Sequence, residues 1–469
     1  MTGTAGAASV AGVNLPALRS HNAALVLDLL RTAGEAGISR LELADRTGLT
    51  PQAVSKITAR LRAEGLAREA GHRASTGGKP RTVLRLVPSA AYAVGVHLDR
   101  DELTAVLVDL AGVRVAVRRA PLDLGAGASA VFEVVEREVD ALRRVGAAGV
   151  GVGGGGIGAG GSVASVGSGA GGGIGGGASG AGGSVGSVGS GAGGGVGGGL
   201  SGAGGSVASV GSGAQGPGTS GAGIAATPER EALETAGSET AGSETAGSEA
   251  APGPDTSAPA LLGVGVAMPG PLDHLTGTPG RVTGYPEWED VPLRDELARR
   301  LGLPVELDKD TNTAALGLAL RAPVADSFAY LHLGTGLGSG LVLGGALHRG
   351  ARTGAGEFGH QTVQLDGPPC DCGGRGCMEV LCLGAVARGD LPEAARILGT
   401  GAMNLVRLLD IDRVVLGGRA VTAAPEVFVH GVGAVLADAG LGTPVAGTAT
   451  PYAVAEGAAQ LILSPIFGK

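Results

Sequence analysis

The stretch 356–379 gathers four side chains that can hold a metal. A histidine is followed after nine residues by a Cys-x-Cys pair, and a third cysteine comes five residues later, with glycines between them. Imidazole nitrogen and thiolate sulfur are preferred ligands of Zn²⁺, and four of them make a closed tetrahedral site. The alternative is four reduced side chains without a metal. The spacing predicts a structural zinc site with these ligands: His360, Cys370, Cys372 and Cys377.

Two other segments can meet a small ligand. The segment Asp308–Asn312 stands where a strand meets a helix, so a carboxylate there can bind a hydroxyl, accept its proton, or simply cap the helix. The segment Leu333–Gly340 is rich in glycine between two strands. Its backbone amides can cradle a phosphate, or the segment can be a tight hairpin. Neither segment decides the function alone.

Strands and helices must alternate around these segments. Apolar runs predict strands at 93–98, 103–110, 261–268 and 305–307, and amphipathic periodicity predicts helices at 130–145, 293–301 and 312–320. The order indicates an α/β domain that is interrupted by a loop insertion.

The insertion, residues 146–258, is a Gly/Ala/Ser-rich low-complexity block in a chain with 92 glycines. So much glycine costs backbone entropy that small side chains cannot offset by burial, so we expect disorder. Its long uncharged run is mostly Gly, Ser and Ala, with few of the Leu, Ile and Phe that drive insertion into a bilayer, so we expect no membrane span. A tolerated surface expansion without activity is the simplest interpretation.

The N-terminal region has the spacing of a winged helix-turn-helix. Helical periodicity covers 16–33, Ser39 and Glu42 form a capping box for a second helix, and Thr50 with Pro51 starts a third. Strands at 66–69 and 82–86 then flank a basic loop that resembles a wing. We expect the exposed face of the third helix and the wing to contact DNA through these residues: Gln52, Ala53, Ser55, Lys56, Arg60, Arg73, Lys79 and Arg81.

Charge supports a nucleic-acid contact at this end of the chain. The whole chain has a net charge of −8, yet residues 1–90 hold twelve Lys and Arg against six Asp and Glu. A basic head on an acidic body favours binding to phosphate. The alternative is a helical bundle that contacts another protein. No secretory signal precedes the head, which predicts a cytoplasmic protein.

These motifs together resemble the ROK family of bacterial repressors and sugar kinases. The resemblance covers nearly the whole chain except the insertion, and it rests on the zinc signature and three further motifs: Leu18-Arg19-Ser20-His21-Asn22, Gly77-Gly78-Lys79-Pro80 and Met268-Pro269-Gly270-Pro271. It implies a two-lobed, actin-like ATPase fold with a sugar in the cleft. It also implies sugar contacts at four positions, with His360 shared with the zinc: Asp310, Glu357, His360 and Glu379.

The same resemblance argues against kinase activity. Family kinases open the body with Asp-x-Gly-Gly-Thr, whose glycines let the backbone approach the phosphates of ATP. The matching stretch here is His97-Leu98-Asp99-Arg100-Asp101. Two carboxylates would repel a triphosphate, and side chains in place of glycines block the close approach.

We therefore expect a sugar-responsive repressor of carbohydrate-metabolism genes that binds double-stranded operator DNA and a sugar or sugar-phosphate effector, as a homodimer or homotetramer. One alternative is an ATP-dependent sugar kinase with a vestigial DNA-binding head. The other is a constitutive DNA-binding regulator with a degenerate sensor, which Lys309 and Gly284 favour because the family has asparagine at both positions.

The predicted architecture has these parts: a winged helix-turn-helix at 1–88, the first part of the first lobe at 89–145, the insertion at 146–258, the second part of the first lobe at 259–325, and the second lobe with the zinc site at 326–469.

Overall fold

The computed structural model describes residues 21–73, 81–148, 259–321 and 326–469. The predicted insertion starts at 146, whereas a helix continues to Ala147. The expected disorder of residues 149–258 and the expected wing contact of Lys79 lie outside the described residues, and for Arg73 only the backbone is described. Within the described ranges, no helix combines the length and the hydrophobicity that a bilayer crossing needs.

In residues 21–73 and 81–86, the head has three α-helices and a three-stranded antiparallel sheet in the order β1-β3-β2. The Ser39 hydroxyl accepts a hydrogen bond from the Glu42 amide, and the Glu42 carboxylate accepts one from the Ser39 amide, which confirms the predicted capping box. Thr50 caps the third helix by accepting from the Ala53 amide, with Pro51 at the first helical position. The elements are α1 (His21–Ala33), β1 (Ile38–Ser39), α2 (Arg40–Thr47), α3 (Pro51–Ala63), β2 (Ala67–Arg73) and β3 (Arg81–Leu86).

The first lobe of the body has a five-stranded sheet in the order β10-β7-β4-β5-β6. Its strands β10, β7 and β4 run parallel, whereas β5 and β6 are antiparallel neighbours. The elements are β4 (Ala91–Leu98), β5 (Glu102–Asp109), β6 (Arg114–Pro121), α4 (Ala128–Ala147), β7 (Ala260–Met268), α5 (Leu293–Leu301) and β10 (Val305–Lys309), with a small hairpin β8 (Leu272–Asp273) and β9 (Thr278–Pro279).

The second lobe has a five-stranded sheet in the order β13-β12-β11-β14-β15. The Gly-rich segment 333–340 forms the turn and start of the β11–β12 hairpin, one of the two alternatives that the sequence left open. The elements are α6 (Asp310–Arg321), β11 (Phe328–Leu333), β12 (Leu337–Leu343), β13 (Ala346–His348), α7 (Met378–Ala387), α8 (Leu391–Leu409), β14 (Arg413–Gly417), α9 (Arg419–Ala423), α10 (Pro425–Asp438), β15 (Val445–Gly447) and α11 (Ala453–Leu463).

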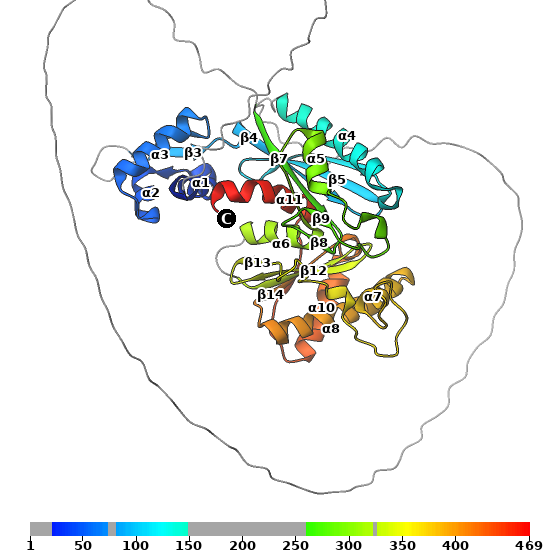
Figure 1. The fold of residues 1–469 in the computed structure, drawn as a ribbon. Helices are drawn as coiled ribbons and strands as arrows, with labels where there is room; N and C mark the ends of the chain where they lie inside the picture. Colours follow the sequence, from blue (N-terminus) through cyan, green and yellow to red (C-terminus); the bar gives the residue numbers. More distant parts are fainter. Residues whose placement is uncertain (1–20, 74–80, 149–258, 322–325) are drawn as a thin grey trace, which may run out of the picture. The chain divides into compact units, whose positions relative to one another are not determined.

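Alternating side chains divide each sheet between two apolar cores. In the first lobe, Val94 and Val96 pack with α4 and α5, whereas Ala93 joins Ala459 of α11 on the opposite face. In the second lobe, Leu331 faces α7, α8 and α10, and Tyr330 faces α6 and α11. Helices therefore cover both faces of both sheets, the arrangement that an α/β domain of this kind requires. Figure 1 shows these elements coloured along the chain.

The helix α6 begins in the cleft and crosses α11 at two glycines. A Cβ atom on Gly317 of α6 would lie 2.9 Å from the Cα atom of Gly457 in α11, so the two helices approach more closely than larger residues permit. The first residue of α6, Asp310, directly follows Lys309, the last residue of β10.

Candidate functional site

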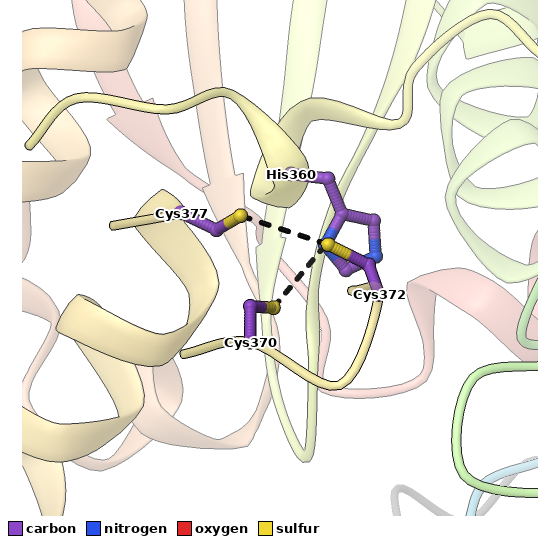
Figure 2. A group of neighbouring side chains, drawn as sticks. All are labelled: His360, Cys370, Cys372 and Cys377. Carbon is purple, nitrogen blue, oxygen red and sulfur yellow. Dashed lines mark hydrogen bonds between the residues drawn. The ribbon is translucent and has the colours of Figure 1, made fainter. Parts of the chain in front are cut away.

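The four predicted metal ligands come together on one loop and one helix end. His360 ends a short 3₁₀ helix, Cys370 and Cys372 lie on the following loop, and Cys377 immediately precedes α7 (Figure 2). Isolated bridges join 362 to 377 and 369 to 375, which brings the loop back on itself. Gly373 and Gly376 have φ values of 90° and 59°, the left-handed conformation that the tight turns need.

Their spacing fits a tetrahedral metal. The four ligand atoms lie within 4.8 Å of one another. The Sγ atoms of Cys372 and Cys377 are 3.7 Å apart, and Cys370 Sγ lies 3.7 Å from His360 Nδ1. Metal–sulfur bonds of about 2.3 Å and metal–nitrogen bonds of about 2.0 Å at tetrahedral angles imply separations of roughly 3.5–3.8 Å. Burial raises the pKa of Cys377 to about 12, so this thiol would ionise near neutral pH only beside a bound cation.

The four residues that the resemblance implies for sugar binding line one cleft of about 70 Å³: Asp310, Glu357, His360 and Glu379. Each carboxyl group has a fixed orientation. Asp310 Oδ1 accepts from the Thr311 amide at 2.6 Å, and Glu379 Oε2 accepts from the Leu337 amide at 2.8 Å. The pKa of Asp310 is raised to about 7, chiefly by burial and also by the nearby carboxylates of Asp99 and Glu357, while the Thr311 amide and Lys309 act in the opposite direction.

Lys309 is directed into this cleft although it stands at a strand end. Its side chain is 3% exposed, and its Nζ lies 3.0 Å from Glu357 Oε1 and also donates to the carbonyl of Ala355. A Cβ atom on Gly270 would lie 2.7 Å from Lys309 Cδ, so the lysine stem lies against that glycine. The preceding residue, Asp308, is fully buried and accepts from Arg349 Nε at 2.6 Å. Asp308 is therefore a structural residue.

An ion-pair cluster joins the two lobes at residues 99–101, which follow β4. Arg419, the first residue of α9, reaches Asp99 Oδ2 at 2.8 Å and Asp101 Oδ2 at 2.9 Å, with a second bond to Asp101. Thr335 of the β11–β12 turn donates to Asp99 Oδ1 at 2.6 Å. Burial raises the pKa of Asp99, but His97, Thr335, Arg419 and the next backbone amide together lower it well below its usual range. We call Arg419, Asp99, Asp101 and Thr335 the clamp.

Sequence reasoning missed the clamp because its partners are far apart in the chain. Arg419 follows the glycine pair 417–418, and its carboxylate partners lie more than 300 residues earlier. The sequence offered one signal. Asp99 and Asp101 stand where the family motif has a glycine and a threonine, and two such carboxylates need a cation nearby.

A second cavity of about 410 Å³ lies beyond the clamp. Asp99 and His332 line both this cavity and the sugar cleft, so these side chains form the wall between them. His97 and His332 make an edge-on ring contact, with centroids 6.3 Å apart, and burial lowers the pKa of His332 to about 4. The imidazole of His332 is therefore neutral at pH 7.

The expected DNA-contacting side chains of α3 are accessible. Gln52, Ser55 and Lys56 are exposed, and Ala53 is half-buried. Arg60 is exposed and lies 3.0 Å from Glu64, so this cation already has an acidic partner. At the start of β3, Arg81 is exposed. On the opposite face of α3, Val54, Thr58 and Leu61 are buried.

Gly284 differs from the asparagine that the resemblance places there. It has a φ of 86°, and a Cβ atom at this position would meet no atom within 4 Å. Trp288 nearby is fully buried and donates its indole N–H to the carbonyl of Leu124 at 2.9 Å. The tryptophan is thus part of the core of the first lobe.

The fold and the site define a class of protein: a winged helix-turn-helix joined to a two-lobed sugar-kinase-like domain of the actin-like type. The ROK family model matches residues 253–389, and the winged helix-turn-helix DNA-binding model matches 26–68. The chain therefore carries a ROK family domain behind a winged helix-turn-helix domain, as the sequence predicted.

Known relatives include both regulators and enzymes. The xylose repressor of Bacillus subtilis is 32% identical over 125 residues, which are 26% of this chain and 31% of that protein. The glucokinase of Thermotoga maritima is 41% identical over 133 residues, 28% of this chain and 42% of that protein. The chain thus spans less than half the length of either relative.

A solved structure shows the same fold. The crystal structure of a ROK family transcriptional regulator, a homologue of the E. coli MLC protein, superposes with a TM-score of 0.57 at 16% sequence identity. It covers 96% of this chain, and this chain covers 97% of it. The superposition includes both the head and the body, so the combination of domains is itself a known arrangement.

Proposed function

We propose that this protein is a sugar-responsive, DNA-binding transcriptional regulator, most simply a repressor of carbohydrate-metabolism genes. The observation that carries the proposal is the joining of a winged helix-turn-helix to a ROK domain whose cleft gathers four carboxyl groups and two histidines. Carboxylates are suitable acceptors for sugar hydroxyls. Xylose repressors among the relatives support the same function.

The proposed DNA contacts are the exposed side chains of α3 and the wing. As a homodimer or homotetramer, the protein would place two α3 helices in successive major grooves of a palindromic operator. The cationic members of the set would displace counterions from phosphates, which makes the affinity fall with salt. The proposed set is Gln52, Ala53, Ser55, Lys56, Arg60, Arg73, Lys79 and Arg81.

We propose Zn²⁺ as a structural ion held by His360, Cys370, Cys372 and Cys377. Bound there, zinc would supply no chemistry beyond fixing the loop and the His360 ring. The His360 ring also lines the sugar cleft, and Glu379 follows the last cysteine ligand by two residues. A fixed loop would therefore orient the proposed sugar contacts, which are Asp310, Glu357, His360 and Glu379.

We propose that the protein is not a kinase. Asp99 and Asp101 stand where the family's glycine and threonine would meet phosphates, and Arg419 fills the space in front of them. The glucokinases among the relatives keep the alternative of an ATP-dependent sugar kinase open to test. That alternative predicts phosphate transfer from ATP to a hexose.

A DNA-binding measurement tests the proposal. The zinc-loaded full chain is titrated against DNA from its own upstream region at several salt concentrations, with and without a panel of sugars. Salt-sensitive, sequence-specific binding that one sugar changes is the expected result. Specific binding that no sugar changes would indicate a constitutive regulator, and no specific binding at low salt contradicts the proposal.

A further inference from the structure

The four proposed metal ligands differ in how far solvent reaches them. Cys372 is exposed, His360 and Cys370 are half-buried, and Cys377 is buried, with 1% of its surface accessible. A reagent in solution therefore meets the cluster first at Cys372. Reactive cysteines combine such access with thiolate character, and a cysteine that holds a metal is a thiolate.

A partner for Cys372 lies close enough to form a disulfide. The Sγ atoms of Cys372 and Cys377 are 3.7 Å apart, and Figure 2 shows them directed toward each other. A disulfide bond of about 2.05 Å requires them to approach by less than about 2 Å. A Cβ atom on Gly374 would lie 3.4 Å from both sulfurs, so this residue has no side chain that separates them.

The backbone on either side of Cys377 is fixed to the first part of the loop. The amide of Gly376 donates to the carbonyl of Pro368 at 2.8 Å, and the amide of Met378 donates to the carbonyl of Gln361 at 3.0 Å. These hydrogen bonds do not depend on a metal. They keep Cys377 in place when the metal is lost.

Cys372 lies instead at the tip of a turn. Cys370 closes this turn, because its amide donates to the carbonyl of Gly374 at 3.0 Å and its carbonyl accepts from the amide of Gly373 at 2.9 Å. A Cβ atom on Gly373 would meet no atom of the described chain within 4 Å, so the tip is not packed there. The tip can therefore move toward Cys377 without displacing a packed side chain.

We propose that Cys372 and Cys377 are a redox switch, in which a hydroperoxide oxidises the pair to a disulfide and the metal leaves the site. The inference rests on the zinc site under the proposed function and adds a modification to its structural role. The disulfide removes two of the four ligands, and His360 with Cys370 alone are too few to hold zinc.

The reaction balances with the hydroperoxide as the oxidant. The Cys372 thiolate attacks one peroxide oxygen, so an S–O bond forms, the O–O bond breaks, and the other oxygen takes a proton and leaves as water or an alcohol. The Cys377 thiolate then attacks the Cys372 sulfur, so the S–S bond forms, the S–O bond breaks, and the hydroxide takes a second proton from solvent. The two sulfurs lose two electrons, and the peroxide gains them.

Oxidation would also reach the proposed sugar site. His360 lines the sugar cleft, and Glu379, which lines it too, follows Cys377 by two residues. Without the metal, the His360 ring loses a contact that fixes its orientation. We therefore expect the oxidised chain to bind its sugar more weakly than the reduced chain.

Zinc release tests the switch. The zinc-loaded full chain is mixed with hydrogen peroxide and a chromogenic chelator, and the same mixture without peroxide is the control. We expect about one zinc per chain to be released at least about tenfold faster with peroxide, and to bind again after reduction by a dithiol. Zinc that stays bound in peroxide overturns the inference. So does zinc that cannot return after reduction, because the thiol has then become a sulfinic acid.

Two proteases locate the disulfide. An endoproteinase that cleaves before Asp371 separates Cys370 from Cys372, and trypsin, which cleaves after Arg375, separates Cys372 from Cys377. We expect mass spectrometry of the oxidised, alkylated chain to find the peptide 371–375 joined to the peptide that begins at 376. A disulfide at Cys370, or release of zinc without any disulfide, contradicts the assignment.

Cys382→Ser is the matched control variant. The Cys382 thiol is fully buried outside the cluster, and it shares a tryptic peptide with Cys377. The variant should release zinc at the wild-type rate and give the same linked peptides. Loss of the linkage in this variant would place the disulfide at Cys382 and overturn the inference.

Two comparisons separate this inference from the proposed function. A reduced chain that binds no zinc rejects the metal site together with the switch, whereas a chain that keeps zinc in peroxide rejects the switch alone. None of the four ligands belongs to the head, so operator affinity without sugar should be equal in the reduced and oxidised chains. Absence of specific DNA binding in the reduced chain, with zinc release intact, rejects only the regulator.

Discussion

Asp310 provides a test of the cleft that needs no ligand. Burial raises its pKa from 3.8 to about 7, so between these pH values the folded protein binds a proton that the unfolded chain has released. When the native state binds more protons, the free energy of unfolding falls as the pH rises. The stabilisation that protonated Asp310 adds to the free energy of unfolding is therefore fully present below pH 4. It is lost progressively between pH 4 and 7 and is absent above pH 7.

Asp310→Asn removes this titration. Each pH unit between the two pKa values corresponds to about 1.4 kcal/mol, so the advantage of the variant over the wild type grows by at most about 3 kcal/mol from pH 5 to pH 7. The Asp310 side chain is only partly buried, and its surroundings relax when it ionises. We therefore expect the stability difference between variant and wild type to grow by about 1–2 kcal/mol over this pH range. Above pH 7 the difference should stay constant.

Urea unfolding between pH 5 and pH 8 measures the difference. Trp288 is the single tryptophan and is fully buried in the first lobe, so its fluorescence reports unfolding of the lobe that carries β10. Asp438→Asn, at an exposed position at the end of α10, is the matched control and should show no pH-dependent difference. A difference between Asp310→Asn and the wild type that is the same at every pH refutes the reasoning.

Three further predictions concern the metal and the head. We expect the wild type to bind about one zinc per chain. Cys377→Ser leaves three metal ligands, so zinc should bind at least tenfold more weakly to this variant in a chelator competition. Equal zinc affinities of variant and wild type contradict the proposed site. Lys56→Ala should weaken binding to all DNA sequences alike and lower the slope of log affinity against log salt by about one per head, measured by fluorescence anisotropy. Glu64→Gln releases Arg60 from its 3.0 Å ion pair and should raise DNA affinity severalfold with a steeper salt slope, and an unchanged slope would place Arg60 away from phosphate.

Elements fixed by local chemistry were predictable from the sequence. The capping box at Ser39 and the start of α3 at Thr50 depend on hydrogen bonds that span three residues, so their sequence patterns locate the helices directly. The helix predicted at 293–301 has those bounds in the structure. The strand β6 was not predicted, because it is an edge strand with exposed arginines and lacks a clear apolar alternation.

The metal site and the clamp show where sequence reasoning ends. The four candidate metal ligands could be predicted from the sequence, because they lie within eighteen residues and tight turns bring them together. The pairing of Lys309 with Glu357, and of Arg419 with Asp99 and Asp101, could be seen only in the folded chain. These contacts depend on how the sheets of the two lobes pack against α6 and α11. The periodicity of a single segment carries no information about its distance from a segment hundreds of residues away.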